Sequence, residues 1–90
     1  MSAEGKTFEA VVTDIRLESR VGLAGTWQMA LDRTEFAVGD TGVLEAVTRS
    51  GTRLEIPVSG VLEDEDGVVW HVVEKPLAAG TEVQGRVEGR

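Results

Sequence analysis

His71 is the only histidine of the 90-residue chain and the side chain best suited to proton transfer near neutral pH. It lies in the apolar segment 68–73, VVWHVV, whose composition is typical of a β-strand. A transition metal bound there would need several carboxylates, because the chain has no cysteine and no second histidine. The spacing of the acidic residues along the sequence indicates no such group of carboxylates around His71. A single histidine in a strand is most often structural, so we expect His71 to be a surface or partly buried structural residue.

The run Glu63-Asp64-Glu65-Asp66, followed by Gly67, is the strongest acidic cluster. Hard cations prefer carboxylate oxygens at alternate positions, but the run lacks the long loop and distal bidentate glutamate of a calcium-binding hand. We therefore predict a solvated hairpin turn in which Gly67 adopts the required backbone angle, and at most a weak, incidental cation site.

The serines offer no sign of nucleophilic catalysis. None of Ser19, Ser50 and Ser59 lies in a Gly-x-Ser-x-Gly segment, and the chain has no Gly-x-x-x-x-Gly-Lys-Ser/Thr phosphate-binding loop. A catalytic site also needs a base or a metal held by orienting partners. The sequence therefore predicts no catalytic residues, no cofactor and no enzymatic activity.

The aromatic and basic residues make a poor nucleic-acid surface. Trp27 and Trp70 both lie on apolar sides of their segments, which favours packing in the core. Arg16, Arg20 and Arg33 lie near one another in sequence without interleaved exposed aromatic residues. The net charge of −7 repels phosphate backbones. Nucleic-acid binding is therefore disfavoured, although the net charge does not exclude a local basic patch.

The elements that position these residues are predicted to be strands, because apolar side chains alternate with a period of two and no segment shows helical periodicity. A phase change after Thr13-Asp14 predicts a bulge or bend, and Pro57 predicts either an edge position or a bulge in its strand. The segment around His71, apolar on both faces, predicts a central strand. The six predicted strands are residues 8–17, 21–31, 43–47, 54–62, 68–73 and 81–88.

Small and acidic residues mark the predicted turns. Gly51 and Gly67 lie where hairpin turns require a positive φ. We expect Asp14, Asp40 and Glu74 to accept hydrogen bonds from turn amides.

Length and composition predict one small domain at residues 7–88, with flexible ends at 1–6 and 89–90. No apolar run approaches the roughly 20 residues of a membrane helix, and the first residues lack a signal-peptide pattern. Together with the absence of cysteine, this favours a soluble, cytoplasmic protein without membrane contact. Seven arginines against two lysines, without asparagine or tyrosine, are compatible with a GC-rich bacterial source.

Four short motifs follow one another along the chain. They are FEAVVTD at 8–14, RVGLAG at 20–25, the structural corner motif Val38-Gly39-Asp40, and Ala79-Gly80-Thr81 before Gly89-Arg90. Their order resembles domain II of the translational GTPases, the β-barrel beside the GTP-binding domain of elongation factor Tu and its relatives. The chain departs from that pattern where the second strand lacks the usual Thr-Gly and where Thr81 replaces a frequent aspartate. The resemblance implies a small six-stranded antiparallel β-barrel of the translation-protein type.

The resemblance does not imply GTP hydrolysis, since the phosphate-binding loop is missing. In the large factors this barrel contacts the acceptor end of tRNA or ribosomal RNA. Our leading hypothesis is a stand-alone, non-catalytic binding or adaptor module that acts through protein contacts made by a barrel face or a strand edge. Two alternatives are an RNA-associated module that contacts tRNA or the ribosome, and a barrel that binds a small ligand in its mouth. The partner and the oligomeric state are open.

Overall fold

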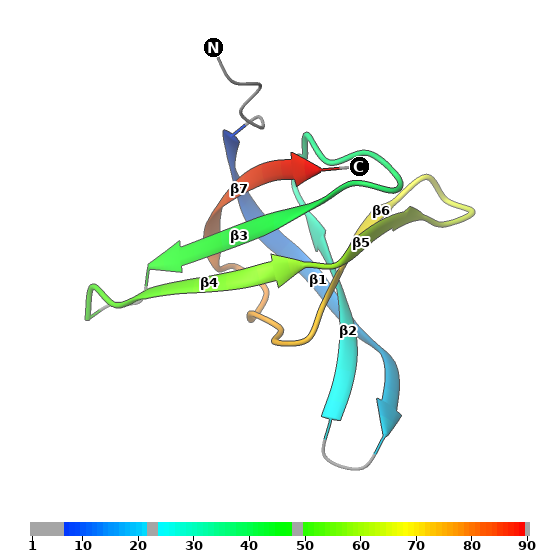
Figure 1. Cartoon of the computed structure of the whole chain (residues 1–90), viewed down its shortest axis with the longest axis horizontal. Helices are drawn as coiled ribbons and strands as arrows, with labels where there is room; N and C mark the ends of the chain where they lie inside the picture. Colours follow the sequence, from blue (N-terminus) through cyan, green and yellow to red (C-terminus); the bar gives the residue numbers. More distant parts are fainter. Residues whose placement is uncertain (1–6, 22–23, 48–49, 90) are drawn as a thin grey trace.

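The computed structural model describes residues 7–21, 24–47 and 50–89, and this part of the chain contains strands and no helices (Figure 1). The fold is therefore all-β, as predicted. No helix long and apolar enough to cross a membrane occurs among the described residues. The strands are β1 (Thr7–Val21), β2 (Ala24–Leu31), β3 (Thr41–Val47), β4 (Arg53–Val58), β5 (Gly60–Glu63), β6 (Val69–Val73) and β7 (Glu82–Gly89).

All seven strands belong to one antiparallel sheet with the order β4-β3-β7-β1-β2-β6-β5. Strand β1 changes partner along its length. Its residues 7–11 pair with β7, and its register with β2 runs from Val12 to Val21. The register shifts between Val12 and Asp14, which confirms the bulge predicted at the phase change. We call β4, β3, β7 and the start of β1 the first half-sheet, and the rest of β1 with β2, β6 and β5 the second half-sheet.

Strands β4 and β5 were predicted as one strand, 54–62, with an interruption at Gly60, and the structure divides it into two strands at Ser59. Strand β4 pairs with β3, whereas β5 pairs with β6 in the other half-sheet. The Ser59 N–H donates to the Val72 carbonyl at 3.0 Å and fixes this corner. The sheet therefore has seven strands where the sequence predicts six. Strand β4 lies at the end of the strand order, as Pro57 predicts, and β6 lies between two neighbours, as its apolar faces predict.

The start of the second strand was also predicted wrongly. Val21 ends β1 and pairs directly with Ala24 at the start of β2. The segment VGLAG contains no Asn-Gly, Asp-Gly or proline turn signal. Because apolar residues alternate without a break here, the prediction began the second strand at Val21, which the structure places at the end of β1. At the other end, β7 continues through Gly89, one residue into the predicted C-terminal tail.

The inward faces of the two half-sheets enclose the core. At the centre, Phe8 and Phe36 meet edge to face with ring centroids 5.8 Å apart. Gly85 provides the space for Phe8, because a Cβ atom at Gly85 would lie 2.6 Å from the Phe8 Cε1 atom. The buried core residues are Phe8, Ala10, Val12, Met29, Phe36, Leu44, Ala46, Ile56, Val58, Val61, Val73 and Val83.

Candidate functional site

His71 is fully buried, so its predicted surface or partly buried position is wrong, although its role is structural. Its Nδ1 atom donates to the Met29 carbonyl at 2.8 Å. A carbonyl oxygen only accepts, which leaves Nε2 to accept from the Thr34 hydroxyl at 2.8 Å. The Thr34 oxygen in turn accepts from the Phe36 N–H at 3.0 Å. The neutral imidazole therefore has both nitrogens satisfied and ties the 34–36 segment to β2 and β6.

Burial lowers the pKa of His71 below its usual 6.5, and the hydrogen bond to Met29 acts in the opposite direction. The ring contacts Phe36 edge to face at a centroid distance of 5.2 Å. An imidazole with both nitrogens bonded inside the core has no atom available to a substrate.

Asp64 organises the acidic turn. Its Oδ1 atom accepts from the N–H groups of Asp66 and Val68, both at 2.9 Å. Its Oδ2 atom accepts from the indole Nε1–H of Trp70 at 2.9 Å. The Trp70 hydrogen bond, followed by that of Val68, lowers the pKa of Asp64 below 3.8. Gly67 has a φ of +83°, as the turn prediction requires. The carboxylate at the centre of the predicted cation site is therefore occupied by protein donors.

Trp70 is buried, but it lies outside the core cluster to which the sequence assigned it. It alternates with His71 along β6 and faces the outer side of the second half-sheet. The Arg16 guanidinium carbon lies 3.9 Å from the centroid of its ring. Arg16 Nε also donates to Gln28 Oε1 at 2.6 Å. Arg16 and Asp64 thus both contact the indole of Trp70.

The other predicted aromatic and basic residues are dispersed. Trp27 is partly buried and packs against the core, in agreement with its prediction. Arg33 makes an exposed ion pair with Glu35 at 3.8 Å. The side chain of Arg20 lies outside the described residues. Arg16 and Arg33 therefore have separate partners among the described residues.

The remaining polar candidates hold local structure. Asp14 accepts from the backbone N–H of the next residue at 2.8 Å, and Glu74 is exposed. The Ser59 hydroxyl lies 3.4 Å from a β6 carbonyl, and that of Ser50 lies 3.3 Å from the hydroxyl two residues later. The side chain of Ser19 is outside the described part. Among the described residues no group of three or more histidine, aspartate or glutamate side chains could hold a metal ion.

The corner motif connects the two half-sheets. Asp40 Oδ2 accepts from the Ala37 N–H at 2.8 Å, and Gly39 has a φ of +93°. The Gly39 N–H donates to the Val61 carbonyl at 3.1 Å and so covers part of the free edge of β5. Val38 is 62% exposed and takes no part in the core.

An apolar hollow of about 660 Å³ lies between the β3–β4 end of the sheet and the 77–82 segment. Leu54 is in phase with the buried Ile56 and Val58 along β4, yet it is 41% exposed. Val47, at the end of β3, is 59% exposed; it alternates out of phase with the buried Leu44 and Ala46 and lies on the outer face of the sheet, at the rim of the hollow. The hollow is thus an uncovered extension of the core. Its lining residues are Ala46, Val47, Leu54, Leu77, Ala79, Gly80, Thr81 and Glu82.

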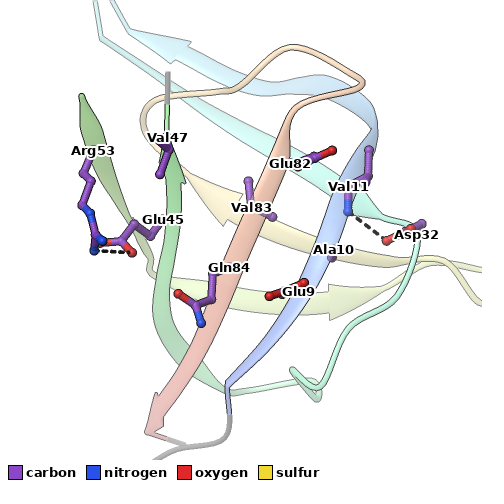
Figure 2. Close-up of a pocket in the computed structure, with 10 residues that line it drawn as sticks. All are labelled: Glu9, Ala10, Val11, Asp32, Glu45, Val47, Arg53, Glu82, Val83 and Gln84. Carbon is purple, nitrogen blue, oxygen red and sulfur yellow. Dashed lines mark hydrogen bonds and ion pairs between the residues drawn. The ribbon is translucent and has the colours of Figure 1, made fainter. Parts of the chain in front are cut away.

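A groove of about 540 Å³ adjoins the hollow on the outer face of the first half-sheet and shares Val47 and Glu82 with it (Figure 2). In register across this face, Glu9 lies opposite Gln84, and Gln84 lies opposite Glu45. Glu45 forms an ion pair with Arg53, and its Oε1 atom lies 3.4 Å from the Arg53 Nη1 atom. Glu9 and Glu82 have no ion-pair partner among the described residues.

Hydrogen bonds hold the segment on the far side of the hollow in place. The Leu77 N–H donates to the Met29 sulfur at 3.2 Å. The Gly80 N–H donates to the Val12 carbonyl at 2.7 Å, and the Val12 N–H donates to the Thr81 carbonyl at 2.9 Å. The hollow is therefore preformed, which lowers the entropy lost when a ligand binds.

The sequence matches none of the protein-family models and none of the curated proteins with which it was compared. The functional argument therefore rests on the geometry of the hollow and the groove, which we together call the β3–β7 face.

Sequence reasoning missed the β3–β7 face, because Leu54 follows the alternation of the core residues Ile56 and Val58 along β4. Val47 alternates out of phase with the buried Leu44 and Ala46, so it did not stand out from other outward-facing residues. The sequence signal that could have pointed to them is the pair of apolar residues flanking the polar hairpin turn, since turns of that kind are usually bordered by solvated positions.

Proposed function

We propose that this protein is a non-catalytic binding module, an adaptor, that acts through contacts with a partner protein. The observation that carries the proposal is Leu54, a core-facing leucine that remains 41% exposed beside the exposed Val47 in a preformed hollow. Covering such side chains contributes about 1–2 kcal/mol each to association. An apolar anchor site with a polar rim is the usual form of a protein-binding hot spot.

The engagement of His71 and Asp64 in structural hydrogen bonds, and the lack of a nucleophile and base pair in the lining of the hollow, support a non-catalytic role. His71 is buried with both nitrogens bonded, and Asp64 is engaged by three donors. The residues that line the hollow include no histidine, serine or lysine. Binding is then the activity that these side chains support best.

We also propose that the sheet closes into a small barrel of the translation-protein type. In this interpretation β4 and β5 are two parts of one bent strand, which gives the six strands that the resemblance implies. The Ser59–Val72 hydrogen bond at the bend and the passage of β1 through both half-sheets support closure. The barrel would serve as the scaffold that holds the hollow open.

Affinity capture from a lysate of the source organism, with and without nuclease, tests the proposal. The baits are the wild type, Val47→Asp, and Val38→Asp as a control that makes the same change at an exposed valine far from the hollow. We expect a protein that survives nuclease and is retained by the wild type and Val38→Asp, but lost with Val47→Asp. Enrichment of tRNA or ribosomal material that disappears with nuclease would contradict the proposal and favour the RNA-associated alternative.

A further inference from the structure

We infer that the β3–β7 face binds an extended partner segment in which an aliphatic side chain is flanked by lysine or arginine. This inference rests on the proposed function and specifies the chemistry of the partner. Two independent features of the face, its apolar hollow and the charge beside it, determine the two parts of the segment.

The hollow determines the aliphatic side chain. Its lining is mostly apolar: Leu54, Leu77 and Ala79 offer methyl groups, Val47 lies at the rim, and Thr81 and Glu82 are the polar residues of the lining. Among the described residues, no buried side-chain nitrogen or oxygen atom is left without a hydrogen bond. A polar side chain entering the hollow would therefore lose its water without replacement, whereas a leucine, isoleucine or valine would gain apolar contacts.

The adjoining groove determines the charge. The outer face of the first half-sheet carries Glu9, Glu45, Glu55, Glu82 and Glu88, against the two arginines Arg53 and Arg86. These arginines already pair with glutamates on the same face, at 3.4 Å and 2.7 Å. A cationic segment is complementary to the charge that remains, whereas an acidic segment or a nucleic acid is repelled.

The register of the face determines the length of the segment. Glu9, Gln84, Glu45 and Glu55 form one row across β1, β7, β3 and β4. With neighbouring strands about 4.8 Å apart, the row spans about 14 Å, which corresponds to about four or five extended residues. Glu82 lies on the rim that the groove shares with the hollow, so a lysine or arginine next to the aliphatic anchor would reach it.

Selection from a random heptapeptide library displayed on phage tests the inference without assuming the sequence of the partner. The bait is the intact wild-type chain. We expect the selected peptides to be enriched in leucine, isoleucine or valine adjacent to lysine or arginine. Isothermal titration of the most enriched peptide then compares the wild type with Glu82→Lys, and with Glu65→Lys as a matched control in the acidic turn.

We expect Glu82→Lys to weaken binding by about tenfold, corresponding to about 1.4 kcal/mol, and Glu65→Lys to leave it nearly unchanged. Both side chains are exposed, so both variants should fold, which thermal melting verifies. Selection of acidic peptides, equal effects of the two variants, or failure to select any peptide would overturn the inference. The affinity capture described above then separates the two proposals. If a protein is still captured by the wild type and lost with Val47→Asp, the proposed function stands although the inference fails. If no such protein is captured, both are wrong.

Discussion

At the scale of single residues, the side chains best suited to chemistry are held by structural hydrogen bonds. His71 bridges Thr34 and the Met29 carbonyl inside the core. The Asp64 carboxylate accepts hydrogen bonds from two backbone N–H groups of its turn and from the indole of Trp70. Both side chains stabilise the fold in one protonation state. Their contributions to stability should therefore depend on pH.

Because His71 is buried in its neutral form, we predict that mild acidification lowers the free energy of unfolding. Its folded pKa lies below 6.5, so the unfolded chain binds the proton first, and the free energy of unfolding falls as the pH drops below 6.5 towards the folded pKa. Urea unfolding at pH 7.5 and pH 5.5 measures this loss. His71→Gln should be less stable than the wild type at pH 7.5 but should show little change between the two pH values. An equal change in both proteins would contradict the neutral, buried imidazole.

Asp64 predicts a second step in more acidic solution. Because its folded pKa lies below 3.8, its stabilisation is complete above that value and is lost as the pH falls through the folded pKa. Asp64→Asn should therefore melt at a lower temperature than the wild type at pH 7, and the difference should shrink near pH 2.5. Asp66→Asn makes the same change two residues further along the turn and is the control. If the melting temperatures of Asp64→Asn and the wild type differed by the same amount at both pH values, the ionised carboxylate would not be the acceptor that stabilises the turn.

At the scale of elements, much of the fold was predictable from period-two alternation and turn glycines. The strands, the bulge near Thr13, the edge position of β4 and the turn at Gly51 follow from local chemistry. An interruption near Ser59 was predicted from Gly60, but the change of partner there was not, because it depends on which strand each part of the chain pairs with. Burial of His71 was missed for the same reason, since Thr34 and Met29 lie far from it in sequence.

Gly85 predicts a specific packing defect in β7. A methyl group there would overlap the Phe8 ring, which is backed by Phe36, so the ring has little room to move. We expect Gly85→Ala to lower the free energy of unfolding by about 1–3 kcal/mol in urea denaturation. Gly60→Ala is the control, since a Cβ at Gly60 meets no atom within 4 Å. Similar losses in the two variants would contradict the close approach of Phe8 to β7.

At the scale of the whole molecule, charge separates the candidate partners. With a net charge of −7, and with Arg16 held over Trp70, the protein should bind tRNA weakly. Filter binding of tRNA should give at most weak retention at 0.05 M salt and none at 0.2 M. Retention at 0.2 M would favour the RNA-associated alternative over a protein partner.

The overall charge and the all-β class were available from the sequence, but the β3–β7 face was not. Its hollow forms where the inward face of β4 extends beyond the opposite half-sheet, at Leu54. That feature depends on the relative lengths and crossing of strands that are distant in sequence, which no local pattern encodes.

The most direct test of the central claim is isothermal titration of the nuclease-resistant partner into the wild type, Val47→Asp and Val38→Asp. An aspartate at Val47, on the rim that the hollow shares with the groove, must be desolvated when the partner covers this rim, whereas a charge at Val38 stays in water. The account predicts at least about a tenfold loss of affinity for Val47→Asp, corresponding to about 1.4 kcal/mol, and wild-type affinity for Val38→Asp. Equal affinities for all three proteins would show that the partner binds elsewhere and would contradict the account.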